Sequence, residues 1–297
     1  MHPHRHTHSS RHKHRLRAVL GLSASFMVVQ VVTGWWTGSL ALLADAAHLF
    51  VDAAGVGLSL LAVWFAERPA TPEKTYGYYR LEILAALVNG VVLCMLAIVI
   101  LIEAWERLRV HHEVMAGPVL IVATAALGVN LLAAWLLHAG AGESLNVRGA
   151  YLEVLGDALS SAAVIVAAGV ILLTGWTRAD ALASAAIGLL ILPRTFSLLR
   201  QAVNVLLEGV PPHLELGEIE SALLGARGIK RVHDLHVWTL TSGREAMSAH
   251  VVVEAGAPAD RILEELHVIL HARFGIDHTT IQIETDSPTL LQISPRA

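Results

Sequence analysis

The sequence predicts a helical membrane domain followed by a small α+β domain, and three observations support this fold class. Hydrophobic residues make up 55% of the chain and charged residues only 15%, whereas about 25% of a typical soluble domain is charged. The apolar residues form long runs before residue 207, and the charged residues are concentrated in the N-terminal tail and after that point. Six of these runs approach the roughly 20 residues that a helix needs to cross a bilayer. We therefore expect a His-rich cytoplasmic tail (1–15), a six-helix transmembrane domain (16–207) and a cytoplasmic domain (208–297).

The six apolar runs are predicted to be membrane-spanning helices at residues 16–36, 40–66, 79–105, 117–137, 149–173 and 179–199. Residues 34–39 are expected to form a tight turn between the first two. The last run is short, and Pro193 should interrupt it, because proline lacks the N–H that a helical hydrogen bond requires. Most Lys and Arg residues flank the spans on the side of the N-terminus, so both termini are predicted to be cytoplasmic.

The pattern changes after Glu208, where Pro211 and Pro212 interrupt the chain. Period-2 alternation of apolar and polar residues predicts strands, and amphipathic runs predict helices. The expected order is a helix, two strands, a helix and a third strand, at residues 214–224, 232–240, 246–253, 259–274 and 279–284. This order favours a small α+β domain with its helices on one face of the sheet.

Two pairs of ionisable residues fall inside predicted spans. His48 and Asp52 are four residues apart in the second span, and Glu153 and Asp157 are four apart in the fifth, so each pair shares one face of its helix. Ionisable groups at membrane depth are costly and usually line a path or a site. Together, one imidazole and three carboxylates predict a tetrahedral metal site. The alternative is that they are ordinary buried, hydrogen-bonded groups. Asp45 is expected to support the site without binding metal.

Histidine is unusually frequent, with 17 copies, and one group of them lies in the N-terminal tail. A His-rich tract is a plausible metal collector, because neutral imidazole is a common metal ligand. The alternative is a tail whose histidines bind nothing. The tail's candidate ligands are His2, His4, His6, His8, His12 and His14.

Several function classes are disfavoured by the sequence. No dense Lys/Arg face suits a phosphate backbone, so nucleic acid is not expected as a partner. The chain contains one cysteine, Cys94, so neither an intrachain disulfide nor a thiolate cluster can form. No P-loop, dinucleotide fingerprint or G-x-S-x-G nucleophile motif occurs. We therefore expect neither enzyme activity nor pumping driven by ATP hydrolysis.

Five strings in order resemble the cation diffusion facilitator family, and in particular its bacterial zinc/cadmium/cobalt efflux branch. They are ADAAHLFVDAAG (44–55), TYGYYRLEILAALVNG (75–90), NVRGAYLEVLGDALSS (146–161), NVLLEGVP (204–211) and VHDLHVWTLTSG (232–243). The resemblance implies a homodimer in the bacterial cytoplasmic membrane, with six membrane helices per subunit and a ferredoxin-like cytoplasmic domain. It also implies secondary active export of divalent metal, zinc first among them, in exchange for protons.

The family's transport-site motif maps onto His48, Asp52, Glu153 and Asp157. The departure is Glu153, because zinc-transporting relatives usually have histidine there. A carboxylate is a harder ligand than imidazole, so cadmium should lose preference, and an exporter that prefers cobalt, manganese or ferrous iron is the alternative. A membrane metal sensor or scaffold is the alternative from another class; it would not need the membrane carboxylates.

In related proteins the cytoplasmic domain binds regulatory metal at the dimer interface. By position, His233, His250 and Glu284 resemble the ligands of that site, whereas Gln282 stands where a histidine ligand can occur. The alternative is a polar sheet face without a metal.

Overall fold

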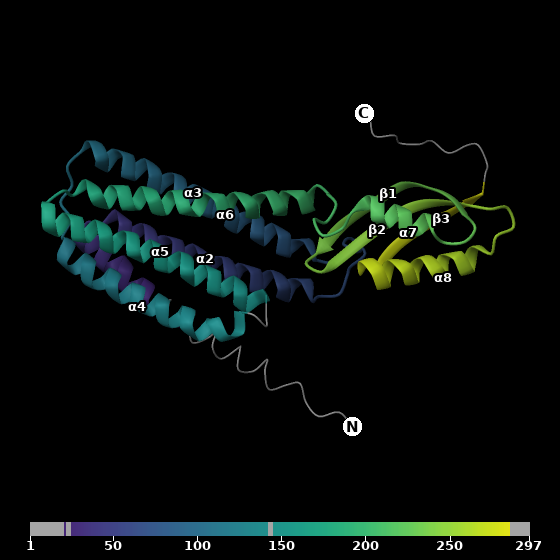
Figure 1. Ribbon diagram of the computed structural model, residues 1–297, viewed down its shortest axis with the longest axis horizontal. Helices are drawn as coiled ribbons and strands as arrows, with labels where there is room; N and C mark the ends of the chain where they lie inside the picture. The colour runs from purple at the N-terminus through teal and green to yellow at the C-terminus, as the bar shows by residue number, and fades with distance from the viewer. Residues whose placement is uncertain (1–20, 22–24, 142–144, 286–297) are drawn as a thin grey trace, which may run out of the picture. The chain divides into compact units, whose positions relative to one another are not determined.

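The computed structural model describes residues 21, 25–141 and 145–285. Residues 25–37 are helical. The long helices that follow run side by side in a bundle (Figure 1). They are α2 (Leu40–Ala66), α3 (Arg80–Arg109), α4 (Ala116–Ala141), α5 (Leu145–Thr174) and α6 (Arg178–Leu206).

Five helices within the described residues, α2 to α6, are long and apolar enough to cross a membrane. Their positions match the last five predicted spans to within a few residues at most ends, and α2 matches at both ends. Small buried residues such as Ala41, Ala97 and Ala123 let the helices approach closely in the core of the bundle. The predicted first span lies partly outside the described residues, so five candidate spans are observed and not six.

The expected interruption at Pro193 is wrong. The α6 helix continues through this residue and runs for 29 residues to Leu206. Proline removes one N–H, and membrane helices tolerate that loss because neighbouring groups and local adjustments satisfy the freed carbonyl. The predicted turn at 34–39 is also shorter than expected, because the helix before it continues to Thr37 and only Gly38 adopts a left-handed conformation (φ 72°).

A carboxylate from α6 caps the N-terminus of α2. Asp180 accepts hydrogen bonds from the hydroxyl of Ser39 (2.6 Å) and the backbone N–H of Leu40 (2.7 Å). Arg107 of α3 donates to the carbonyl of Gly38 (2.6 Å) in the same turn. A negative charge is favourable at a helix N-terminus, where backbone N–H groups lack helical partners. These bonds tie three helices together at one end of the bundle.

We expect Asp180→Asn to destabilise the membrane domain, because the buried cap loses its charge and one of its acceptors. Hydrogen bonds to a charged group contribute about 1.5–3 kcal/mol, so the variant should melt several degrees lower. Thermal unfolding of the purified full-length protein in detergent measures this. Ser39→Ala, which removes a single bond to the same carboxylate, should have a smaller effect. A melting temperature equal to that of the parent would contradict the capping role.

The C-terminal domain contains α7 (Leu216–Leu224), β1 (Ile229–Thr241), β2 (Arg244–Val253), α8 (Ala259–Ile269) and β3 (His278–Thr285). The strand order is β1-β2-β3, with β1 antiparallel and β3 parallel to β2. Apolar side chains of α7 and α8, including Ile219, Leu223 and Leu266, pack with the strands in one core. The predicted α-β-β-α-β order is therefore confirmed, and the last helix ends in one π-helical turn before Gly275 (φ 69°).

Candidate metal sites

The first candidate site begins with two residues of α2. Nε2 of His48 lies 3.3 Å from Oδ2 of Asp52, one helical turn away. Both side chains are largely shielded from solvent. Nδ1 of His48 and Oδ2 of Asp52 are buried and have no hydrogen-bond partner among the described residues. Buried polar atoms are normally satisfied, so two such atoms on one face are unusual, and both are metal-ligand atoms.

Two residues of α5 complete the predicted set. Asp157 is buried, and Glu153 is partly exposed. The charge of Glu153 acts on both His48 and Asp52 of α2. The charges of Glu153 and Asp52 also act on Asp157. The two pairs therefore interact electrostatically between α2 and α5, and the assignment of all four residues to one metal site stays a prediction.

A fifth charged residue joins this cluster from α6. Nη2 of Arg194 lies 3.2 Å from Oε2 of Glu153. The positive charge of Arg194 also acts on His48, Asp52 and Asp157, so Arg194 interacts electrostatically with all four predicted ligands. The sequence analysis did not identify Arg194, and helical spacing could not have found it, because it lies on a different helix from every predicted ligand. The only signal was a lone arginine near the end of an apolar run.

Asp45 lies one turn before His48 and is fully buried. Its Oδ2 accepts a hydrogen bond from Nε2 of Gln30 (2.6 Å), which the sequence analysis also missed. Oδ1 of Asp45 and Oε1 of Gln30 have no partner among the described residues. Asp45 contributes to the electrostatic environment of Asp157. This arrangement agrees with a residue that supports the cluster from within the bundle.

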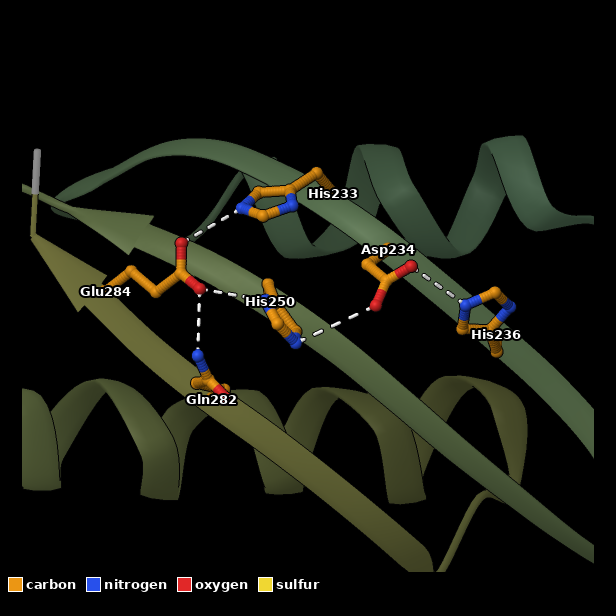
Figure 2. Close-up of polar contacts among 6 residues, drawn as sticks. All are labelled: His233, Asp234, His236, His250, Gln282 and Glu284. Carbon is orange, nitrogen blue, oxygen red and sulfur yellow. Dashed lines mark hydrogen bonds and ion pairs between the residues drawn. The ribbon is translucent and has the colours of Figure 1, made fainter. Parts of the chain in front are cut away.

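The second candidate site lies on the sheet of the C-terminal domain. Figure 2 shows the Glu284 carboxylate between two imidazoles. Nε2 of His233 lies 3.0 Å from its Oε2, and Nδ1 of His250 lies 2.8 Å from its Oε1. The sheet register explains this, because His233 on β1 pairs directly with His250 on β2. Among the described residues, only this group of three has ligand atoms that all lie within 4.8 Å of one another.

The charge state of Glu284 suits a ligand. Its small burial would raise the pKa of the carboxyl, but hydrogen bonds from His233 and His250 outweigh this and lower the pKa below its usual range. The carboxylate is therefore ionised at neutral pH, as metal binding requires. Two imidazoles and one carboxylate form a set typical of zinc sites that keep one position open.

Neighbouring polar residues orient this second site. Nε2 of Gln282 donates to Oε1 of Glu284 (2.9 Å), so it fixes a ligand and is not one of the three (Figure 2). Asp234 has a positive φ of 53° at an irregularity in β1, and its carboxylate lies 3.0 Å from Nε2 of His236 and 3.8 Å from Nε2 of His250. The tail histidines of the sequence analysis lie outside the described residues.

Comparison with known families matches both parts of the chain. The family model described as "cation efflux transmembrane domain" matches residues 16–207, and "cation efflux protein, cytoplasmic domain" matches residues 211–286.

Three curated relatives are similar over most of their length. The metal cation efflux system protein CzcD of Cupriavidus metallidurans is 43% identical over 282 residues, covering 95% of this chain and 89% of that protein. The zinc transporter ZitB of Shigella flexneri is 42% identical over 289 residues, covering 95% and 92%. A cadmium, cobalt and zinc/H(+)-K(+) antiporter of Bacillus subtilis is 38% identical over 268 residues, covering 88% and 86%.

Proposed function

Because this chain belongs to the cation efflux family, we propose that it exports divalent transition-metal ions, zinc first among them, in exchange for protons. The family makes it a membrane transporter and not an enzyme. The observation that carries the proposal is the pair on α2, where Nδ1 of His48 and Oδ2 of Asp52 are buried without a hydrogen-bond partner among the described residues.

We assign the transport site to His48, Asp52, Glu153 and Asp157. One imidazole and three carboxylates, supplied by facing helices, provide four ligands for a tetrahedral ion. Zinc remains the first candidate because its intrinsic affinity for such ligands exceeds that of manganese or cobalt. The relatives are named for zinc, cadmium and cobalt, which supports the same group of substrates. The carboxylate at Glu153 should make cobalt, manganese and ferrous iron more competitive than an imidazole would.

Proton exchange is supported by the chemistry of the ligands. Carboxylate and imidazole groups must lose their protons to bind metal, so protons and metal compete for one set of atoms. One relative is named as a proton-coupled antiporter. In this account His48 acts as a proton carrier, because the unperturbed pKa of histidine lies near about 6.5.

The wider architecture completes the proposal. We infer a homodimer in the bacterial cytoplasmic membrane, with six spans per subunit, both termini in the cytoplasm and a ferredoxin-like C-terminal domain. Five described candidate spans, the helical segment 25–37 and the match to a cytoplasmic dimerisation-type domain support this inference. The domain boundaries at residues 15/16 and 207/208 follow from the change in composition.

Transport by the purified protein in proteoliposomes, with zinc, cadmium, cobalt and manganese compared at a set pH gradient, tests the function. Zinc should enter fastest. If none of these metals moves, the export proposal fails.

The cluster on the sheet favours a second, regulatory role for the C-terminal domain. We propose that His233, His250 and Glu284 bind zinc on the cytoplasmic side and tune activity, while the membrane site carries the flux.

We therefore expect His250→Ala to reduce the zinc-induced rise in melting temperature of the full-length protein, because it removes one of three ligands. Loss of one ligand should weaken this site about 100-fold, with a smaller effect on transport rate. His271→Ala, on an exposed face of the same domain, serves as the matched control. If His250→Ala leaves the zinc-induced shift unchanged, no metal binds at this cluster. If His250→Ala abolishes all transport in a folded protein, the result favours a membrane metal sensor over a transporter whose C-terminal domain only tunes activity.

A further inference from the structure

Arg194 has no part in the function proposed so far, yet it pairs with Glu153, and its charge acts on the other three assigned ligands. It projects from α6, whereas the ligands belong to α2 and α5. Its Nη2 lies 3.2 Å from Oε2 of Glu153, and the charge of Glu153 in turn acts on Asp52. The pair is therefore connected directly to the metal-ligand cluster.

The charges of this cluster balance only when Arg194 is included. With metal bound, three ionised carboxylates and a neutral imidazole carry three negative charges. A divalent ion neutralises two of them and leaves one uncompensated negative charge in a medium of low dielectric constant, where unpaired charge is costly. Arg194 supplies the remaining positive charge. This balance counts the four assigned ligands and takes the buried Asp45, which is bonded to Gln30, as protonated.

The side chains of Arg194 and Glu153 have room to change conformation. The Arg194 side chain is 62% exposed and that of Glu153 is 33% exposed, whereas Asp157 is buried. A partly exposed guanidinium can shift away when Glu153 turns toward a metal ion, without leaving a hole in a packed core. Solvent screens the charge of the exposed guanidinium, so its effect on the cluster is strongest while it pairs with Glu153.

We propose that Arg194 and Glu153 act as one unit that makes the metal-loaded transport site electrically neutral, so that Arg194 sets how tightly a divalent ion is held and how fast it leaves. This inference rests on the transport site assigned above. Arg194 is a positioning and specificity-determining residue that acts through Glu153 and binds no metal itself. When Arg194 is present, a bound divalent ion brings the net charge of the site to zero. A monovalent ion leaves the site with a net negative charge.

A double-mutant cycle tests the unit. Zinc binding is measured at one fixed pH by calorimetry on the full-length protein in detergent, and transport kinetics are measured in proteoliposomes. All variants carry His250→Ala, so that the cytoplasmic cluster contributes little.

Arg194→Gln should bind zinc about tenfold more tightly and release it more slowly, with kcat about tenfold lower, since one negative charge is left over. Glu153→His should bind about tenfold more weakly, because Arg194 is then uncompensated. The double variant restores neutrality, so the opposite effects on affinity should cancel and kcat should recover to within about threefold of the parent.

Two single variants separate charge from structure. Arg194→Lys keeps the charge and should resemble the parent. Arg200→Gln removes an exposed arginine from the same helix and should change neither quantity. A purely structural role for Arg194 predicts instead a lower melting temperature and no rescue by Glu153→His.

A double variant whose kcat stays as low as that of Arg194→Gln, or an Arg194→Lys variant that behaves like Arg194→Gln, would overturn the proposal. Asp157→Ala in the same assays reports on the assigned site separately. If that variant retains the membrane-domain zinc binding, the site itself is wrong. If it loses binding while the double variant shows no recovery of kcat, only the role of Arg194 is wrong.

Discussion

Asp157→Ala should abolish zinc transport. Asp157 is buried on α5 and interacts with the charges of Asp52 and Glu153, so in the proposed site its removal deletes one of four ligands. Removal of residues that merely orient a ligand already costs about 10–100-fold, so loss of a ligand should reduce the rate by about 100-fold or more. Asp52→Ala should behave in the same way. Initial rates of zinc uptake into proteoliposomes, normalised to inserted protein, provide the measurement.

Two further variants make this result specific. Asp157→Asn preserves shape and hydrogen bonding but not charge, and should also be inactive. Glu106→Ala removes an exposed carboxylate from α3 and should transport at the parent rate. If Asp157→Ala and Asp52→Ala insert normally and still move zinc as the parent does, the site lies elsewhere.

Collapse of the pH gradient should have the second large effect. Ligands that must be deprotonated to bind metal exchange it for protons, so an acidic vesicle interior should drive zinc inward. Each exchanged proton contributes about 1.4 kcal/mol per pH unit, which corresponds to about tenfold accumulation. Zinc and internal pH are followed together, with the membrane potential clamped, before and after a protonophore is added. Zinc uptake that neither moves protons nor responds to the gradient would exclude exchange.

The membrane helices could be predicted closely because the bilayer imposes a length and an apolar composition on each one. Residues 40–66 illustrate this, since prediction and α2 coincide. Pro193 shows where a local rule fails. Proline ends many helices in water, but within a bundle the cost of one missing hydrogen bond is smaller than that of ending a helix inside the membrane.

The candidate sites could be predicted only in part. The spacing of His48 and Asp52 places both on one face wherever the helix packs, so the pair was visible in the sequence. The residues that other helices contribute to the cluster could not be identified from this spacing. Which residues Glu153 and Asp45 meet depends on how whole helices rotate against each other, and sequence spacing contains no information about that. Arg194 and Gln30 were therefore found only in three dimensions.

The C-terminal cluster depended on strand register. His233 and His250 are 17 positions apart in the sequence but are direct partners across β1 and β2. Irregularities in β1 alter which residues face each other, so alternation alone does not fix the pairing. The resemblance to a family suggested these ligands, and the register explains why their atoms meet.

The most direct test of the central claim is the position of the transported ion in the full-length protein. Zinc anomalous diffraction from crystals soaked in the metal locates it without any assumption about rates. The account predicts a peak between α2 and α5, about 2.0–2.2 Å from Nε2 or Nδ1 of His48 and from carboxylate oxygens of Asp52 and Asp157. It also predicts that this peak disappears in Asp157→Ala while a peak at His233 and His250 remains. Zinc found only in the C-terminal domain, with none between the two helices in a protein that transports zinc, would contradict it.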